Sequence, residues 1–271
     1  GLCVAVLAGI VIIGGVKSIA RVCGWLVPFM ALFYVVGCIY ILIVNSAYVW
    51  PAIKLIFSSA FTAHAAGGGF AGSTLMLAAR YGITRGLFSN ESGLGSAPIV
   101  AAAAQTRNPV RQALVSSSGT FWDTVVICAL TGIVVVSSVI ANPDINYTDG
   151  GTLTHAAFSK IPVVGTPLLS IGLVTFAFST ILGWSYYGER AIEYLAGNRS
   201  SLIYRILFII ALFVGSVVSL GMVWNIADCF NALMALPNLI SLLLLSGVIA
   251  RETNRYLWNG RLDETDDTME G

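Results

Sequence analysis

The stretch at residues 85–98, RGLFSNESGLGSAP, places an acidic side chain and several hydroxyl and amide groups within a strongly apolar part of the chain. Glu91 lies near its centre, and Gly93 and Gly95 follow it. Glycine at this density, with a proline three residues later, predicts a broken helix. Inside hydrocarbon, backbone groups freed by a break need partners from the protein or from a water-filled cavity. The stretch therefore predicts a polar binding site, and an ionisable residue there is a functional candidate.

The sequence leaves two interpretations of Glu91 open. It either contributes to a binding site or belongs to a structural polar cluster that fixes the break, with Arg80 or Arg85 as its partner. A third chemistry, nucleophilic catalysis by Ser92, needs a general base within reach. Both histidines of the chain fall in predicted outer loops. The sequence therefore argues against an enzyme and predicts no catalytic residue.

A second polar group lies in the uncharged run at residues 161–188, where Ser179 and Thr180 are adjacent. A helix over this run would align Thr180 with Trp184 and Tyr187 along one face. Hydroxyl oxygens are hard ligands that suit a small cation such as Na⁺, and a neighbouring indole could line a small substrate pocket. The alternative is that both hydroxyls only bond back to the preceding helical turn.

Asp123 and Asp228 also lie within apolar runs. A charged side chain at the bilayer centre costs at least about 3 kcal/mol, so both carboxylates are expected to point into the helix bundle. Asp123 shares a helical face with hydroxyl residues, and Asp228 shares one with Asn225 and Asn231. Polar contact between helices and a role in coupling are both open for these two residues.

Composition places the chain in a membrane. Of its 271 residues, 57% are hydrophobic and 10% are charged, whereas soluble domains carry about 25% charged residues. We therefore predict an all-α protein that crosses the bilayer several times. The net charge of +1 gives no basis for nucleic-acid binding. The cysteines and histidines lack the spacing of a metal site or a disulfide framework, so neither is expected.

Basic residues orient the predicted spans, because Lys and Arg accumulate in cytoplasmic loops. They follow every second apolar run, and the last group places the C-terminus in the cytoplasm. Seven spans are predicted, at residues 1–16, 22–46, 66–106, 112–141, 162–195, 203–220 and 223–250. The third is too long for one straight crossing of about 20 residues. We expect a membrane domain at 1–251 and a polar cytoplasmic tail at 252–271.

Three segments carry a resemblance to a known family: GGGFAGSTLMLAARYGITRGLFSNESGLGSAPIVAAAA, GLVTFAFSTILGWSYYGERAIEYL and VWNIADCFNALMALPNLISLLLLSGV. Over residues 10–250 the chain resembles the alanine or glycine:cation symporters, also called sodium:alanine symporters. The resemblance implies the C-terminal part of a leucine-transporter-like inverted-repeat fold, with a substrate site near the bilayer midplane. The chain would run from the end of core helix 4 through core helix 10. We therefore expect an N-terminally truncated sequence that carries half of each site and lacks the family's GTGN-type broken helix.

The resemblance also implies roles for individual residues. The substrate would contact Phe88, Ser89, Asn90 and Trp184. The cation would bind Ser179 and Thr180. Structural or coupling roles would fall to Glu91, Gly93, Gly95, Asp123 and Asp228. No cofactor and no metal are implied beyond the transported Na⁺.

The leading functional hypothesis is a secondary active transporter that brings alanine or glycine into the cell together with Na⁺. It would lie in the cell membrane, specifically the inner membrane of a bacterium. One alternative is a proton-coupled amino-acid transporter of the same fold, with Glu91 or Asp123 as the proton carrier. Another is a fragment that does not transport.

Overall fold

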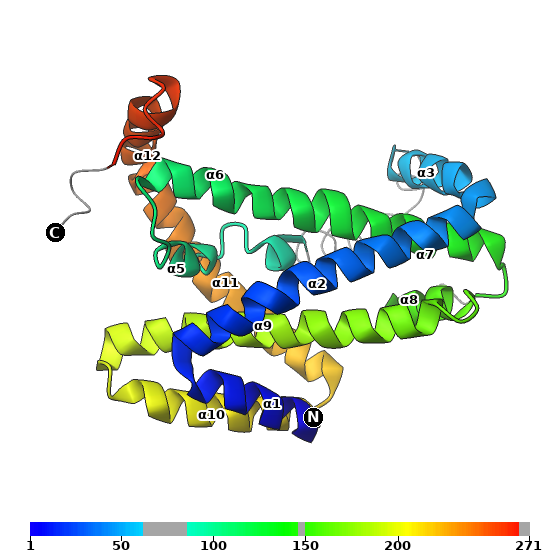
Figure 1. The fold of residues 1–271 in the computed structure, drawn as a ribbon, viewed down its shortest axis with the longest axis horizontal. Helices are drawn as coiled ribbons and strands as arrows, with labels where there is room; N and C mark the ends of the chain where they lie inside the picture. The colour runs from blue at the N-terminus through cyan, green and yellow to red at the C-terminus, as the bar shows by residue number, and fades with distance from the viewer. Residues whose placement is uncertain (62–85, 146–149, 266–271) are drawn as a thin grey trace, which may run out of the picture. The chain divides into compact units, whose positions relative to one another are not determined.

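The computed structural model describes residues 1–61, 86–145 and 150–265 (Figure 1). Every regular element within these ranges is helical, which confirms the predicted all-α class. The helices are α1 (Leu2–Ile13), α2 (Gly15–Val44), α3 (Ser46–Phe61), α5 (Ala97–Ala101), α6 (Pro109–Thr120), a π-helical segment (Phe121–Cys128), α7 (Ala129–Ala141), α8 (Gly150–Ser159), α9 (Gly165–Ala196), α10 (Ser200–Gly215), α11 (Leu220–Leu244), α12 (Ser246–Thr253) and a second π-helical segment (Asn254–Trp258).

Four helical stretches in the described part of the chain are long and apolar enough to cross a membrane: Gly15–Val44, Pro109–Ala141, Gly165–Ala196 and Gly221–Leu244. The helices α1 and α10 are shorter and also apolar. Together these elements overlap six of the seven predicted spans. Much of the remaining span, at 66–106, lies outside the described residues, as do Arg80 and Arg85. A total of seven spans therefore stays a prediction.

The chain divides into two compact units, and each is described by itself. The α2–α7 unit comprises residues 6–82 and 124–185. Within it, α7 packs against α2, α3 and α8. Its buried core consists of Tyr34, Cys38, Ile41, Val134, Phe158, Ile161, Leu168 and Leu169. Tyr34 and Thr131 share a hydrogen bond of 2.9 Å between their hydroxyl oxygens, which ties α2 to α7 inside this apolar core.

An exposed ion pair joins the two ends of the segment that contains α8. Lys160 donates to the carboxylate of Asp144, and this hydrogen bond is the main cause that lowers the pKa of Asp144. A lowered pKa stabilises the folded state above the unfolded pKa, and this contribution is lost as the pH falls through the lowered value. We expect Lys160→Met to lower the melting temperature slightly at neutral pH. At a pH below the lowered pKa of Asp144, the substitution should leave the melting temperature unchanged. Melting curves across that pH range would check this.

The α6–α11 unit comprises residues 1–5, 83–123 and 186–271. In it, α12 packs against α6 and α11, and α5 packs against α6 (Figure 1). Helix α9 ends at Ala196, and the next residue, Gly197, has a φ of +77°, the left-handed conformation common just after helix C-termini. A buried ion pair holds α10 to the end of α9: Arg205 Nε donates to Glu189, which is 1% exposed, at 3.0 Å.

The chain end is bound to the start of α6 through Asn108, whose side chain is fully buried. Its Oδ1 accepts from the backbone N–H of Arg111 at 2.9 Å, which caps the helix, and Pro109 occupies the first turn. Its Nδ2 donates to the carbonyl oxygens of Leu262 and Glu264 at 2.9 and 3.0 Å. The predicted polar tail therefore begins as a helix that ends at Trp258. The residues that follow are bound by the side chain of Asn108, which caps α6.

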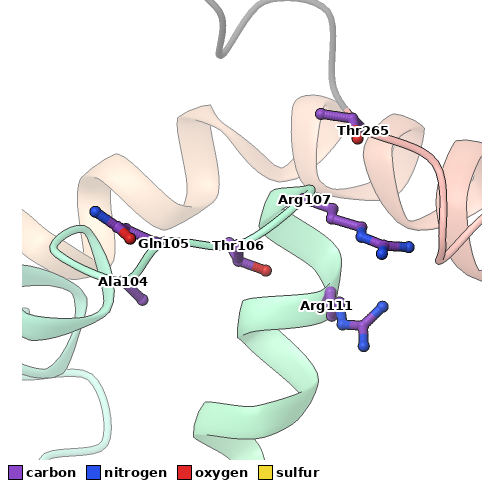
Figure 2. Close-up of a pocket in the computed structure, with 6 residues that line it drawn as sticks. All are labelled: Ala104, Gln105, Thr106, Arg107, Arg111 and Thr265. Atoms are coloured by element: carbon purple, nitrogen blue, oxygen red, sulfur yellow. The ribbon is translucent and has the colours of Figure 1, made fainter.

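Beside this contact lies a cavity of about 580 Å³, lined by Ala104, Gln105, Thr106, Arg107, Arg111 and Thr265. Figure 2 shows Arg107 and Arg111 extending to the same side of the start of α6. Arg111 forms an ion pair with Asp263 at 2.8 Å. None of the predicted site residues lines this cavity, so it belongs to the tail contact and not to the predicted substrate site.

Candidate transport site

The chain leaves the helix where the sequence predicts a break. Residues 86–90 are helical, and the next helix, α5, begins at Ala97. Between them Glu91, Gly93 and Gly95 have φ values of 53°, 78° and 83°. Three left-handed residues within five cannot continue a right-handed helix. Glycine adopts this conformation without strain, whereas Glu91 is held there against its ordinary preference.

Hydroxyl groups hold the Glu91 carboxylate. Ser96 donates to Oε2 at 2.9 Å, and Tyr187 donates to Oε1 at 3.3 Å. Ser96 is the last residue of the break and Tyr187 belongs to α9, so the Glu91 carboxylate joins the two ends of the non-helical stretch to a neighbouring helix. These contacts are compatible with both roles that the sequence leaves open for Glu91, the structural and the functional one. Its predicted partners Arg80 and Arg85 lie outside the described residues.

Asn238 of α11 also contacts the break. Its Nδ2 donates to the carbonyl oxygen of Gly93 at 3.0 Å. A Cβ atom at Gly95 would lie 3.1 Å from the Asn238 side chain. A backbone carbonyl without a helical partner is costly in hydrocarbon, so this hydrogen bond stabilises the break directly. Sequence reasoning missed this role of Asn238, because no pattern within α11 indicates which loop its side chain meets.

The structure brings Ser89 and Asp123 together. The Ser89 hydroxyl donates to Asp123 Oδ2 at 2.8 Å. Asp123 lies in the π-helical segment Phe121–Cys128, and π-helical turns within α-helices are frequent at functional sites. The sequence predicted both residues separately, one for the substrate and one for coupling. Their direct contact follows from the fold and not from their spacing.

Phe88 and Trp224 form an edge-to-face ring pair with centroids 6.1 Å apart. This ring pair places α11 next to Phe88, a predicted substrate residue. Sequence reasoning did not single out Trp224. Asn90 donates through Nδ2 to the carbonyl oxygen of Gly86 at 3.0 Å, which satisfies a backbone group in the last turn before the break. Asp228 lies half-buried on α11 in the same unit.

The predicted cation residues belong to the α2–α7 unit, as does Trp184. The hydroxyls of Ser179 and Thr180 both donate to the carbonyl oxygen of Phe176, each at 2.9 Å. Ser179 also lies 3.6 Å from the sulfur of Met30. The back-bonding expected of membrane helices is therefore present. It uses only the hydroxyl hydrogens and leaves the oxygen lone pairs as acceptors.

Comparison with known proteins agrees with these features. Residues 1–270 match the sodium:alanine symporter family. The sodium/alanine symporter AgcS of Methanococcus maripaludis is 49% identical over 257 residues, which are 94% of this chain and 56% of AgcS. An uncharacterised transporter of Haemophilus influenzae is 47% identical over 97% of this chain and 58% of its own. The probable sodium/glutamine symporter GlnT of Bacillus subtilis is 35% identical, covering 94% and 53%.

Apolar helices and these relatives define a multi-pass membrane protein, and the relatives are named as transporters or symporters rather than enzymes. The chain belongs to the sodium:alanine symporter family, as its three quoted segments predict. It spans about half the length of the curated relatives that it matches.

Proposed function

We propose that the full-length protein is a secondary transporter in the bacterial inner membrane, with its C-terminus in the cytoplasm, that carries a small neutral amino acid inward with Na⁺. The observation that carries this proposal is the break at residues 91–96, held by Glu91 and Asn238 in a chain of this family. Alanine or glycine is the proposed substrate, because AgcS is named for alanine at 49% identity, whereas GlnT, named for glutamine, is 35% identical.

In this proposal the break and its surroundings form one part of the substrate site. Phe88 supplies an apolar surface, and Ser89 and Asn90 supply polar groups next to a backbone that is not helical. Trp184 would also contact the substrate, and Gly93 and Gly95 would permit the turn. Asp123 and Asp228 would position polar groups within the bundle. Because coupling is reciprocal, substrate and cation must each bind more tightly when the other is bound.

Ser179 and Thr180 would bind the cation through their oxygen lone pairs. Each hydroxyl hydrogen already points to the Phe176 carbonyl. The free lone pairs of both oxygens can therefore coordinate Na⁺ without breaking the helix. This arrangement reconciles back-bonding with cation binding.

Uptake into proteoliposomes tests the proposal. The full-length protein should accumulate radiolabelled alanine when an inward Na⁺ gradient is imposed. Accumulation should cease when the Na⁺ concentration is equal on both sides and no membrane potential is present. A protein that binds or accumulates no small neutral amino acid under any cation gradient would contradict the proposal.

Thr180→Ala tests the cation assignment. It removes one oxygen ligand, so we expect the Na⁺ concentration for half-maximal alanine uptake to rise about tenfold, as loss of about 1.4 kcal/mol of binding would produce. Thr175→Ala is the matched control, because Thr175 lies on the same helix and donates back to Ile171 at 2.8 Å. An equal Na⁺ requirement in the two variants would remove Thr180 from the cation site.

Proton coupling is a second candidate, favoured by one observation. Within the described residues, the side-chain partners of Glu91 and Asp123 are hydroxyl groups: Ser96 and Tyr187 for Glu91, and Ser89 for Asp123. A carboxylate in an apolar span is a candidate proton carrier. Alanine uptake driven by a pH gradient in Na⁺-free buffer would establish this candidate and overturn the Na⁺-coupled one.

A further inference from the structure

The C-terminal part of the chain contacts one short segment at both of its ends. Asn238 of α11 donates to the carbonyl oxygen of Gly93 at 3.0 Å. The chain then continues through α12 and the second π-helical segment (Figure 1). Two backbone carbonyl oxygens beyond that helix accept from Asn108. We call residues 238–264 the C-terminal strap and residues 93–108 the bridged segment, because the first connects the two ends of the second.

The bridged segment contains little helix of its own. Helix α5 has five residues, with the break before it and the non-helical residues 102–108 after it. A helix of this length is marginal, because forming the first turn is costly and few hydrogen bonds follow it. The position of α5 therefore depends largely on tertiary contacts, and the C-terminal strap supplies one at each end of the bridged segment.

Asn108 carries the contact at the far end. Its side chain is fully buried, and its Nδ2 donates to the two strap carbonyls at 2.9 and 3.0 Å. In the neighbouring ion pair, the side chains of Arg111 and Asp263 are 49% and 86% exposed, so water and salt screen the pair and it contributes little. Chain ends also open more readily than the core of a protein. One buried amide therefore mainly determines whether the C-terminal strap stays bound.

The break provides a hinge for the bridged segment. Its left-handed residues are Glu91, Gly93 and Gly95, and residues at the ends of helices commonly absorb the backbone rotations of a conformational change. A secondary transporter must open its site to each side of the membrane in turn. Rotation of α5 about the break would strain or open the contact at Asn108, because that contact lies at the other end of the bridged segment.

We propose that the C-terminal strap restrains α5 and slows the conformational change of transport, and that opening of the Asn108 contact releases this restraint. The inference rests on the proposed function and adds to it a regulatory element outside the substrate site. Contacts made in only one of two conformations stabilise that conformation. Their removal should therefore let the protein leave it more readily and transport faster.

Asn108→Asp in the full-length protein tests the inference, because it keeps an oxygen that can cap α6 and removes the donor to the strap. In proteoliposomes, hydrogen–deuterium exchange of the bridged segment should become about tenfold faster, as loss of about one hydrogen bond would produce. The initial rate of alanine uptake at saturating alanine and Na⁺ should at least double. Asn259→Ala, at an exposed position of the same chain end, should change neither quantity.

A reversible crosslink tests the opposite change. Arg111→Cys and Asp263→Cys, in a protein without other cysteines, can be joined by a flexible reagent that carries two thiol-reactive groups and forms disulfides. The crosslink holds the strap on the start of α6, so alanine uptake should fall at least twofold. Reduction with dithiothreitol should restore it, and the two single-cysteine variants should not respond.

Three results would overturn the inference: unchanged exchange in Asn108→Asp, faster exchange with an uptake rate that does not rise, or a crosslink that leaves uptake unchanged. In the second case the contact would serve only the fold. Failure of the wild-type protein to take up alanine would overturn the proposed function and this inference with it. That failure is distinguishable, because it appears before any variant is compared.

Discussion

Gly95→Ala should destabilise the protein more than a methyl group added at any other glycine near the break. The φ of +83° costs a side-chain-bearing residue about 1–2 kcal/mol. The new Cβ would also lie 3.1 Å from Asn238, and overpacking of this kind costs about 1–3 kcal/mol. Asn238 cannot move away freely, because it donates to the Gly93 carbonyl. We therefore expect a clear fall in melting temperature and in the yield of monodisperse protein.

Two neighbouring glycines serve as controls for Gly95. Gly93 has a φ of +78°, but among the described residues a Cβ there meets only Leu239, at an ordinary 3.5 Å. Gly86 lies in a helix, and a Cβ there has no atom of the described chain within 4 Å. The expected order of destabilisation is Gly95, then Gly93, with Gly86→Ala neutral or slightly stabilising. Equal stability of Gly95→Ala and Gly86→Ala would show that the break does not have this conformation.

Asn108→Ala should release the end of the chain and weaken the start of α6. Loss of the cap costs about 1 kcal/mol, and the two tail carbonyls lose their shared donor. Trypsin can report this release, because Arg255 and Arg261 lie in or next to the bound segment. We expect cleavage at these arginines to become at least tenfold faster than in the wild-type protein.

A second substitution separates the two roles of Asn108. Asn108→Asp keeps an oxygen that can cap α6 but replaces the donor with a carboxylate facing two carbonyl oxygens. It should therefore release the tail as fully as alanine while lowering the melting temperature less. Asn259→Ala is the control, since its side chain is exposed at the same chain end. Wild-type cleavage rates in both Asn108 variants would contradict the tail contact.

The sequence predicted much of this structure because its signals are local. Apolar runs located six helices, and the glycines around Glu91 located the break, since the φ values that a break requires suit glycine. The positions of Ser179 and Thr180 on one helix also follow from the chain itself. The family was evident from three contiguous segments. Each of these features depends on neighbouring residues and needs no knowledge of tertiary contacts.

The partners of the break could not be read from the sequence. Asn238 lies 145 positions after Gly93, and Tyr187 lies 96 positions after Glu91, so only the packing of α9 and α11 decides these pairs. Trp224 looks like an ordinary member of an apolar helix until Phe88 is located beside it. The tail contact was missed for the same reason, because a charged chain end gives no sign of a buried asparagine 154 residues earlier.

The helical stretch Pro109–Ala141 contains the π-helical segment Phe121–Cys128. Its geometry therefore depends on the number of residues in that segment. Each of its turns contains an extra residue relative to an α-helix. A deletion of one codon here would let the segment return to an α-helix and keep its hydrogen bonds. It would also move Asp123 on the surface of the helix, because an α-helical turn holds fewer residues than a π-helical turn. We therefore expect deletion of one residue here to disturb the Ser89–Asp123 contact, and to be harder to tolerate than a conservative substitution in the same segment.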